Sequence, residues 1–87
     1  MTDGKMTAKA YVLIRTAPGL TKTISSSLRI SPMVQSVEMI TGEYDLIVAI
    51  EAASTNEILA TVMKQIRPAA GIRDTVTYLV VPGEELD

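Results

Sequence analysis

The 87-residue chain contains no cysteine, histidine, tryptophan or phenylalanine. Without cysteine and histidine it has no disulfide bonds, no thiol nucleophile, no zinc site of the Cys/His kind and no histidine general base. These absences remove most common catalytic arrangements. We therefore predict no enzyme activity, no catalytic residues, no metal site and no cofactor.

The chain also lacks an excess of positive charge and a long apolar segment. Eight basic and ten acidic side chains give a formal net charge of −2, which does not suit a protein that grips nucleic-acid phosphates by itself. Charged residues interrupt every apolar run well before the roughly 20 residues needed to cross a bilayer. The polar N-terminus does not resemble a secretory signal. We expect a cytoplasmic protein with no membrane segment and no direct nucleic-acid contact.

The length and composition suit one small globular domain. Apolar residues make up 47% of the chain and charged residues 21%, close to the averages of folded domains. We predict a domain over residues 8–82. Residues 1–7 and 83–87 are predicted to be flexible termini because they are polar or acidic.

The first half of the chain reads as a strand followed by a helix. Residues 10–16 form an apolar, partly β-branched run that ends before the turn pair Pro18-Gly19. Leu20, Ile24 and Leu28 then recur every four residues, which is the spacing of one helix face. Pro32 is predicted to end this helix.

The second half reads as a hairpin, a helix and a last strand. Residues 34–41 and 44–52 are rich in β-branched and aliphatic side chains and meet at Gly42-Glu43. Ser54 and Glu57 have the spacing of a capping box, which starts a second helix. We expect five apolar positions on one face of that helix, and Pro68 and Gly71 beyond its end. These positions are Ile58, Leu59, Val62, Met63 and Ile66. Residues 72–81 form the last strand.

This order of elements predicts an α+β fold, the ferredoxin-like βαββαβ sandwich. Its crossovers are right-handed and its antiparallel sheet has the spatial order four, one, three, two. Both helices then lie on one face of the sheet.

The strands are apolar at both alternating positions. Leu46 and Val48 share one face of the third strand, and Ile47 and Ala49 share the other. Because two helices cover only one face, the second apolar face predicts an interface. We predict a homodimer in which two sheets pack face to face as a dimeric αβ barrel. The alternative is a monomer whose N-terminal segment covers the sheet.

Four segments in this order resemble the effector-binding (RAM) domain of the Lrp/AsnC family of feast/famine regulators. Gly42-Glu43-Tyr44-Asp45 matches the Gly-x-Tyr-Asp hairpin signature of that family. Residues 10–15, 31–37 and 71–77 resemble its first strand, its entry to strand two and its entry to the last strand. The resemblance covers about residues 8–81. Because family regulators carry a helix-turn-helix ahead of this domain and none precedes residue 8 here, we expect the stand-alone version.

The resemblance implies a role in transcription regulation through small effectors, often amino acids, that bind between dimers. It implies homodimers that assemble further into tetramers or octamers, with DNA-binding Lrp/AsnC relatives as possible partners. The ACT-type amino-acid domain shares the element order, but the hairpin signature favours the Lrp/AsnC family.

The hairpin offers groups that suit a free amino acid. Asp45 could accept the ammonium group, and backbone amides near Gly42 could approach the carboxylate. Thr75 and Thr77 add hydroxyl groups, which by resemblance meet the hairpin across a subunit contact. The candidate ligand-binding residues are Gly42, Glu43, Tyr44, Asp45, Thr75 and Thr77.

Each of these residues also has a purely structural interpretation. Gly42 could serve only as a turn residue with positive φ, and Asp45 could bond only local amides. Tyr44 could be a packing residue, and the threonines ordinary strand residues. Arg15 and Arg29 are expected to lie on solvated surfaces.

Three functional hypotheses follow. The first is an effector-binding and oligomerisation module without its own DNA-binding domain. The second is a pure assembly subunit that joins DNA-binding relatives without sensing a ligand. The third is a small dimeric αβ-barrel enzyme, which the absence of histidine, tryptophan and phenylalanine disfavours.

Overall fold

The protein was analysed as a computed structural model, which describes residues 7–81. Within these residues the four strands form one antiparallel sheet in the order β2-β3-β1-β4. The elements are β1 (Ala8–Thr16), α1 (Thr21–Leu28), β2 (Val34–Met39), β3 (Leu46–Ala52), α2 (Thr55–Thr61), the π-helical turn η1 (Val62–Ile66) and β4 (Ile72–Leu79). This arrangement confirms the predicted α+β, ferredoxin-like βαββαβ fold and its strand order. The predicted flexible segments lie outside the described residues, except for residue 7.

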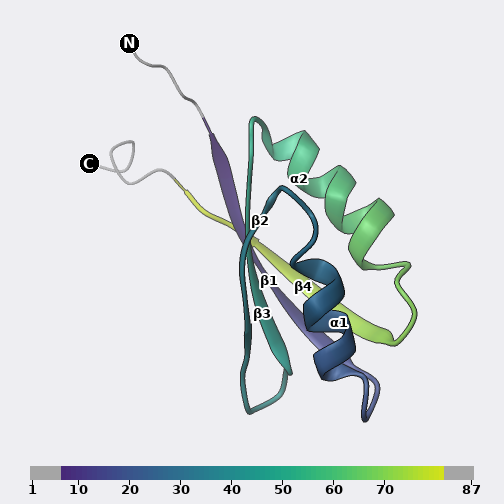
Figure 1. Ribbon diagram of the computed structural model, residues 1–87. Coiled ribbons are helices and arrows are strands. Elements are labelled where there is room, and N and C mark those ends of the chain that lie inside the picture. Colours follow the sequence, from purple (N-terminus) through teal and green to yellow (C-terminus); the bar gives the residue numbers. More distant parts are fainter. Residues whose placement is uncertain (1–6, 82–87) are drawn as a thin grey trace.

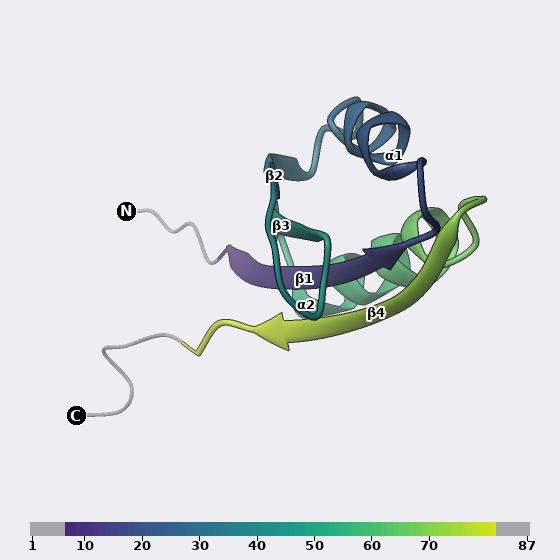
Figure 2. The same ribbon diagram turned by 90° about the horizontal axis from the view of Figure 1, so that it is seen from below.

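The molecule has two layers. Both helices lie on the same side of the sheet, and no helix or strand of residues 7–81 covers the opposite side (Figure 1). Figure 2 shows the strongly twisted sheet curving toward the helices. Most helix-facing side chains of the central strands β1 and β3 are fully buried, and they form the floor of the core. The largest fully buried side chains are Ile14, Leu46, Ile50, Ile58, Ile66, Val12 and Val48.

The second helix begins where the sequence predicts. The Ser54 hydroxyl accepts a hydrogen bond from the Glu57 N–H at 3.2 Å, which satisfies one of the unpaired amides of the first turn. The Glu57 carboxylate reaches back to the N–H of Ala53 at 3.3 Å. In the standard capping box the glutamate bonds to the N–H of the N-cap residue, which is Ser54 here. Glu57 bonds instead to the N–H of the residue before it, Ala53.

The apolar face of this helix is narrower than predicted. Ile58, Val62 and Ile66 are buried, whereas Leu59 and Met63 are 42% and 56% exposed. The Arg67 N–H bonds to the carbonyl of Val62, five residues earlier. This wider π turn lets residues four apart stack above one another, so a single row of side chains reaches the sheet. The prediction that Leu59 and Met63 share the core face is wrong.

The strands that meet at the hairpin are shorter than predicted. The Ile40 N–H donates to the carbonyl of Asp45 at 2.9 Å, which closes the connection between β2 and β3. Residues 40–45 therefore form the hairpin loop. At the other end of the sheet, the Val80 N–H still bonds to Lys9 of β1 at 2.8 Å.

Candidate functional site

The hairpin loop of residues 40–45 lies against the end of β1. The Asp45 N–H donates to the carbonyl of Ile14 at 2.9 Å. Gly42 has a φ of +137°, and a Cβ atom added there would meet nothing within 4 Å. Gly42 therefore serves as a turn residue with positive φ, as its structural interpretation predicted. Its open surroundings also leave its backbone accessible to a ligand.

The Asp45 carboxylate ties the hairpin to β1. Its Oδ2 accepts hydrogen bonds from the Thr16 N–H at 2.8 Å and the Thr16 hydroxyl at 3.3 Å. The Thr16 hydroxyl also lies 2.7 Å from the hydroxyl of Thr21 at the start of α1. Because Thr16 is only 6% exposed, these bonds satisfy polar groups that water does not reach. Asp45 therefore has a structural role, but its partner is Thr16 of β1, 29 positions away, and not a local amide of the hairpin.

Arg15 is the residue of this site that the sequence prediction missed. Its guanidinium lies 5.1 Å from the centre of the Tyr44 ring and 3.6 Å from Oε2 of Glu43. Arg15 is therefore paired with the hairpin, while its side chain stays 39% exposed on a solvated surface, as expected. The register between β1 and β3 brings Arg15 to the hairpin. Ile14 pairs with Leu46, so the next residue of β1, Arg15, lies beside Asp45.

Arg29 is exposed, as expected, and also makes a contact with the protein. Its guanidinium donates a hydrogen bond to the carbonyl of Val37. This contact attaches the end of α1 to β2 and lies apart from the hairpin loop.

Thr75 and Thr77 do not join the hairpin within one chain. They lie on β4 opposite Ile14 and Val12 of β1, and β1 separates β4 from β3. Both threonines are half-buried on the helix-covered face. A shared site with the hairpin would need a second copy of the chain, so their role as ligand-binding residues stays a prediction.

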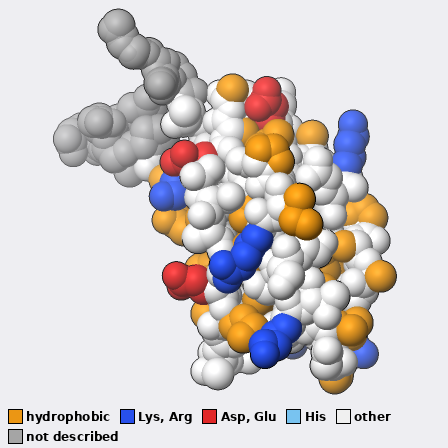
Figure 3. Space-filling view, in the orientation of Figure 1, with side chains coloured by type: hydrophobic (Ala, Val, Ile, Leu, Met, Phe, Trp, Pro, Cys, Tyr) orange, Lys and Arg blue, Asp and Glu red, His pale blue; other side chains and the backbone are white. Residues whose placement is uncertain are grey.

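The uncovered face of the sheet, called here the open face, is apolar in its centre. Tyr11 of β1 pairs with Tyr78 of β4 and Ala49 of β3, and Leu13 pairs with Ile47. Tyr11 and Tyr78 are 36% and 58% exposed. In the view of Figure 3, hydrophobic side chains are scattered among other atoms over the visible surface. The predicted pairing of two open faces remains compatible with this geometry.

None of the helices in residues 7–81 combines the length and hydrophobicity required to span a bilayer.

The chain matches the family model of the Lrp/AsnC ligand binding domain over residues 9–82. An uncharacterized HTH-type transcriptional regulator of Pyrococcus furiosus is 35% identical over 73 residues, which are 80% of this chain and 49% of the regulator. The chain thus spans about half the length of the curated regulators it matches.

Solved structures show the same fold. The crystal structure of FFRP-DM1 superposes with a TM-score of 0.83 at 28% identity, covering 85% of this chain and 99% of that chain. A transcriptional regulator of Neisseria meningitidis in complex with L-Met superposes with a TM-score of 0.78 at 19% identity, covering 86% of this chain and 50% of that chain. The latter similarity concerns the fold alone. The family model, which matches nearly the whole chain, shows that this chain belongs to the Lrp/AsnC ligand-binding domain family.

Proposed function

We propose that this domain binds a free amino acid at its β2–β3 hairpin and couples binding to the assembly of its copies. The observation that carries the proposal is the position of Arg15 beside Glu43, Tyr44 and Asp45. A zwitterionic ligand needs a cationic and an anionic partner close together. Arg15 and Glu43 provide both at the hairpin. The L-Met complex of the Neisseria regulator supports an amino acid as the ligand class.

The ion pair between Arg15 and Glu43 suits exchange with a ligand. The side chains are 39% and 75% exposed and their charged atoms are 3.6 Å apart, so water weakens their attraction. A ligand carboxylate can form two parallel hydrogen bonds with the Arg15 guanidinium, which is the stronger arrangement. The released Glu43 carboxylate then accepts a hydrogen bond from the ligand ammonium group.

The path from the hairpin to assembly runs through β1. The hairpin bonds to β1 at Ile14 and Thr16, and the same strand presents Tyr11 and Leu13 on the open face. Burial of the open face against a second copy removes its apolar side chains from water. A ligand that binds one assembly more tightly than another shifts the equilibrium between the two assemblies. The size of the shift equals the difference in binding free energy.

The first experiment is a thermal-shift screen with the twenty amino acids, followed by calorimetric titration of those that stabilise the protein. We expect Arg15→Ala to weaken binding by about tenfold or more, because the lost charge-assisted bonds contribute roughly 1.5–3 kcal/mol. Lys64→Ala is the matched control, since Lys64 is an exposed cation on η1 away from the hairpin. Blocking either charge of the ligand, by N-acetylation or amidation, should have the same effect as Arg15→Ala.

Two results would contradict the proposal. One is the absence of stabilisation by every amino acid at millimolar concentration. The other is equal affinity of the native protein and the Arg15→Ala variant.

The pure assembly subunit remains the second candidate. It is favoured by the structural role of Asp45, whose carboxylate is already engaged by Thr16. Co-purification with an Lrp/AsnC regulator that carries a helix-turn-helix, together with a failed amino-acid screen, would select this function.

A further inference from the structure

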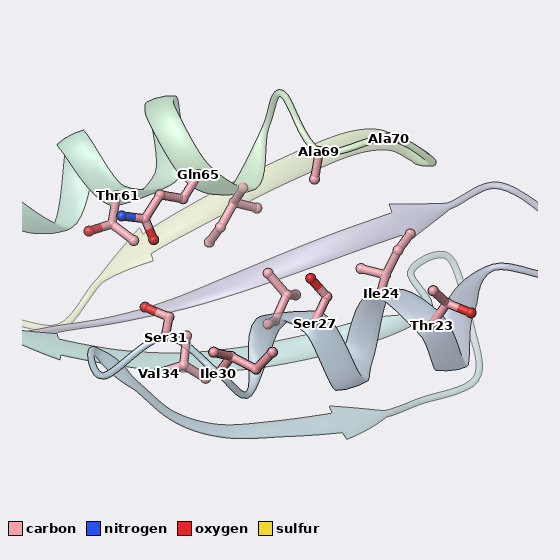
Figure 4. A pocket seen from close by; sticks show the side chains of 12 residues that line it. Thr23, Ile24, Ser27, Ile30, Ser31, Val34, Thr61, Gln65, Ala69 and Ala70 are labelled. Carbon is pink, nitrogen blue, oxygen red and sulfur yellow. The ribbon is translucent and has the colours of Figure 1, made fainter.

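A groove runs between the two helices, on the side of the sheet opposite the open face. Its volume is about 530 Å³, and it is lined by residues of α1, the turn after α1, β2, the end of α2, η1 and the loop before β4. Figure 4 shows Gln65 pointing from the second helix into the gap, with Ser27 and Ser31 on the other side. The volume lies within the range of about 300–1,000 Å³ that is typical of small-molecule sites.

The groove has an apolar floor and a polar, uncharged rim. Ile24 and Ile66 are buried on the floor, and Val34 is half-buried beside them. None of the groove's lining residues within 7–81 is Asp, Glu, Lys or Arg. This composition contrasts with the hairpin, where Arg15 and Glu43 face each other.

The polar groups of the rim are available to a ligand. Among the hydrogen bonds of the described residues, none involves the side chains of Ser27, Ser31 or Gln65. Gln65 carries both a donor and an acceptor, and each serine hydroxyl can act as either. Gln65 and Ile66 also belong to the π-helical turn η1, a feature that is frequent at functional sites.

We propose that this groove is a second ligand site, which takes a small uncharged molecule with an apolar body and an amide-like or hydroxyl hydrogen-bonding group. The apolar body contacts Ile24, Val34 and Ile66, and the polar group bonds to Gln65 and a rim serine. A charged molecule would lose water there without meeting an opposite charge, which is costly. The site therefore discriminates against the zwitterionic amino acids proposed for the hairpin, and it does not depend on that function.

Benzamide and benzoate are the probes for this proposal, because they share a shape and differ in charge. We expect benzamide to shift the backbone ¹⁵N–¹H resonances of Ser27, Ser31 and Gln65 in a saturable manner. Benzoate should bind there at least about tenfold more weakly, which corresponds to about 1.4 kcal/mol. Equal effects of both probes at these residues, or no saturable shift with benzamide, would overturn the proposal.

Matched variants locate the site. Ser27→Phe fills the groove with a ring and should abolish the benzamide shifts, whereas Ser26→Phe, one residue along α1 and outside the groove lining, should leave them. Gln65→Ala provides a second test that keeps the groove open, and it should weaken benzamide binding by about threefold or more through the lost hydrogen bond. Spectra without ligand verify that each variant is folded.

Unchanged benzamide binding in folded Ser27→Phe and Gln65→Ala would overturn the proposal. It would also be overturned if the groove resonances moved with protein concentration in the absence of a probe, because a second copy of the chain would then occupy the groove.

Discussion

The Thr16 N–H donates a hydrogen bond of 2.8 Å to the Asp45 carboxylate, across 29 positions of sequence. This bond joins the end of β1 to the hairpin loop that contains the proposed amino-acid site. Asp45 therefore positions the loop whether or not it also contacts a ligand. A loss of binding in an Asp45 variant would report both roles together, which is why Arg15 is the better probe of ligand contact.

Asp45→Ala should lower the free energy of unfolding by about 1–3 kcal/mol, because it leaves the buried Thr16 N–H without its acceptor. Urea unfolding monitored by circular dichroism measures this change. Glu43→Ala in the same loop is the control. It should change stability by less than about 0.5 kcal/mol, because the carboxylate is 75% exposed and its ion pair is weak. Equal effects of the two substitutions would show that the Asp45–Thr16 bond does not stabilise the fold.

Gly71→Ala should destabilise the protein more than Gly19→Ala. Both glycines have positive φ, at +91° and +83°, so alanine at either position costs about 1–2 kcal/mol in backbone strain. A Cβ at Gly71 would also lie 2.7 Å from Cδ1 of Leu20 and 3.1 Å from Cδ1 of Ile24, whereas one at Gly19 meets nothing within 4 Å.

The difference between the two glycine variants isolates the steric part, which we expect to reach about 1 kcal/mol or more. Leu20→Ala introduced together with Gly71→Ala should recover part of the loss, because it removes the nearest atoms. Thermal unfolding of the four proteins measures these differences. An equal loss of stability for Gly71→Ala and Gly19→Ala would show that the side chains of Leu20 and Ile24 move aside at little cost.

Tyr78→Glu should shift the protein from dimer to monomer if two open faces pack together as proposed. The substitution places a charge within the proposed apolar contact, and a buried unpaired charge costs several kcal/mol. We expect the dissociation constant to rise by about 100-fold or more, which corresponds to at least 2.7 kcal/mol. Sedimentation velocity over a range of concentrations measures it.

Leu59→Glu is the control for the dimer prediction. Leu59 is a comparably exposed apolar residue, at 42% against 58% for Tyr78, and it lies on α2 in the other layer. Its substitution should leave the dissociation constant unchanged. A native protein that sediments as a monomer at micromolar concentration would contradict the dimer itself.

The fold was largely predictable because its signals are local. Turn residues such as Pro18 and Gly42 mark where strands end, the pair Ser54 and Glu57 starts a helix, and runs of β-branched and aliphatic residues mark the strands. Connection rules then leave few topologies for this order of elements. The family signature at residues 42–45 pointed to Asp45 as a candidate ligand-binding residue.

The contacts that define the candidate sites were not predictable from the same signals. The approach of Arg15 to Tyr44 depends on the register between β1 and β3, which local propensity does not determine. The side of β4 on which Thr75 lies was equally open, because both alternating positions of that strand carry apolar residues. The groove between the helices depends on the distance between α1 and η1, for which the sequence carries no local signal.

Ile66→Ala and Met63→Ala should separate the two faces of the second helix. Ile66 is 1% exposed and Met63 is 56% exposed, although both occupy apolar positions that the periodicity assigns to one face. Truncation of Ile66 removes buried methyl groups and leaves a cavity, which costs about 2–5 kcal/mol. Truncation of Met63 should cost less than about 0.5 kcal/mol, since its side chain is largely in water.

Urea unfolding of both variants measures this difference, and it tests the π-helical turn directly. If η1 were a regular α-helical turn, residues four apart would drift around the helix axis and Met63 would share the burial of Ile66. The two substitutions would then destabilise the protein by similar amounts. A large loss for Ile66→Ala with a negligible loss for Met63→Ala requires instead that only one row of side chains reaches the sheet, as the Arg67–Val62 hydrogen bond of the π turn implies.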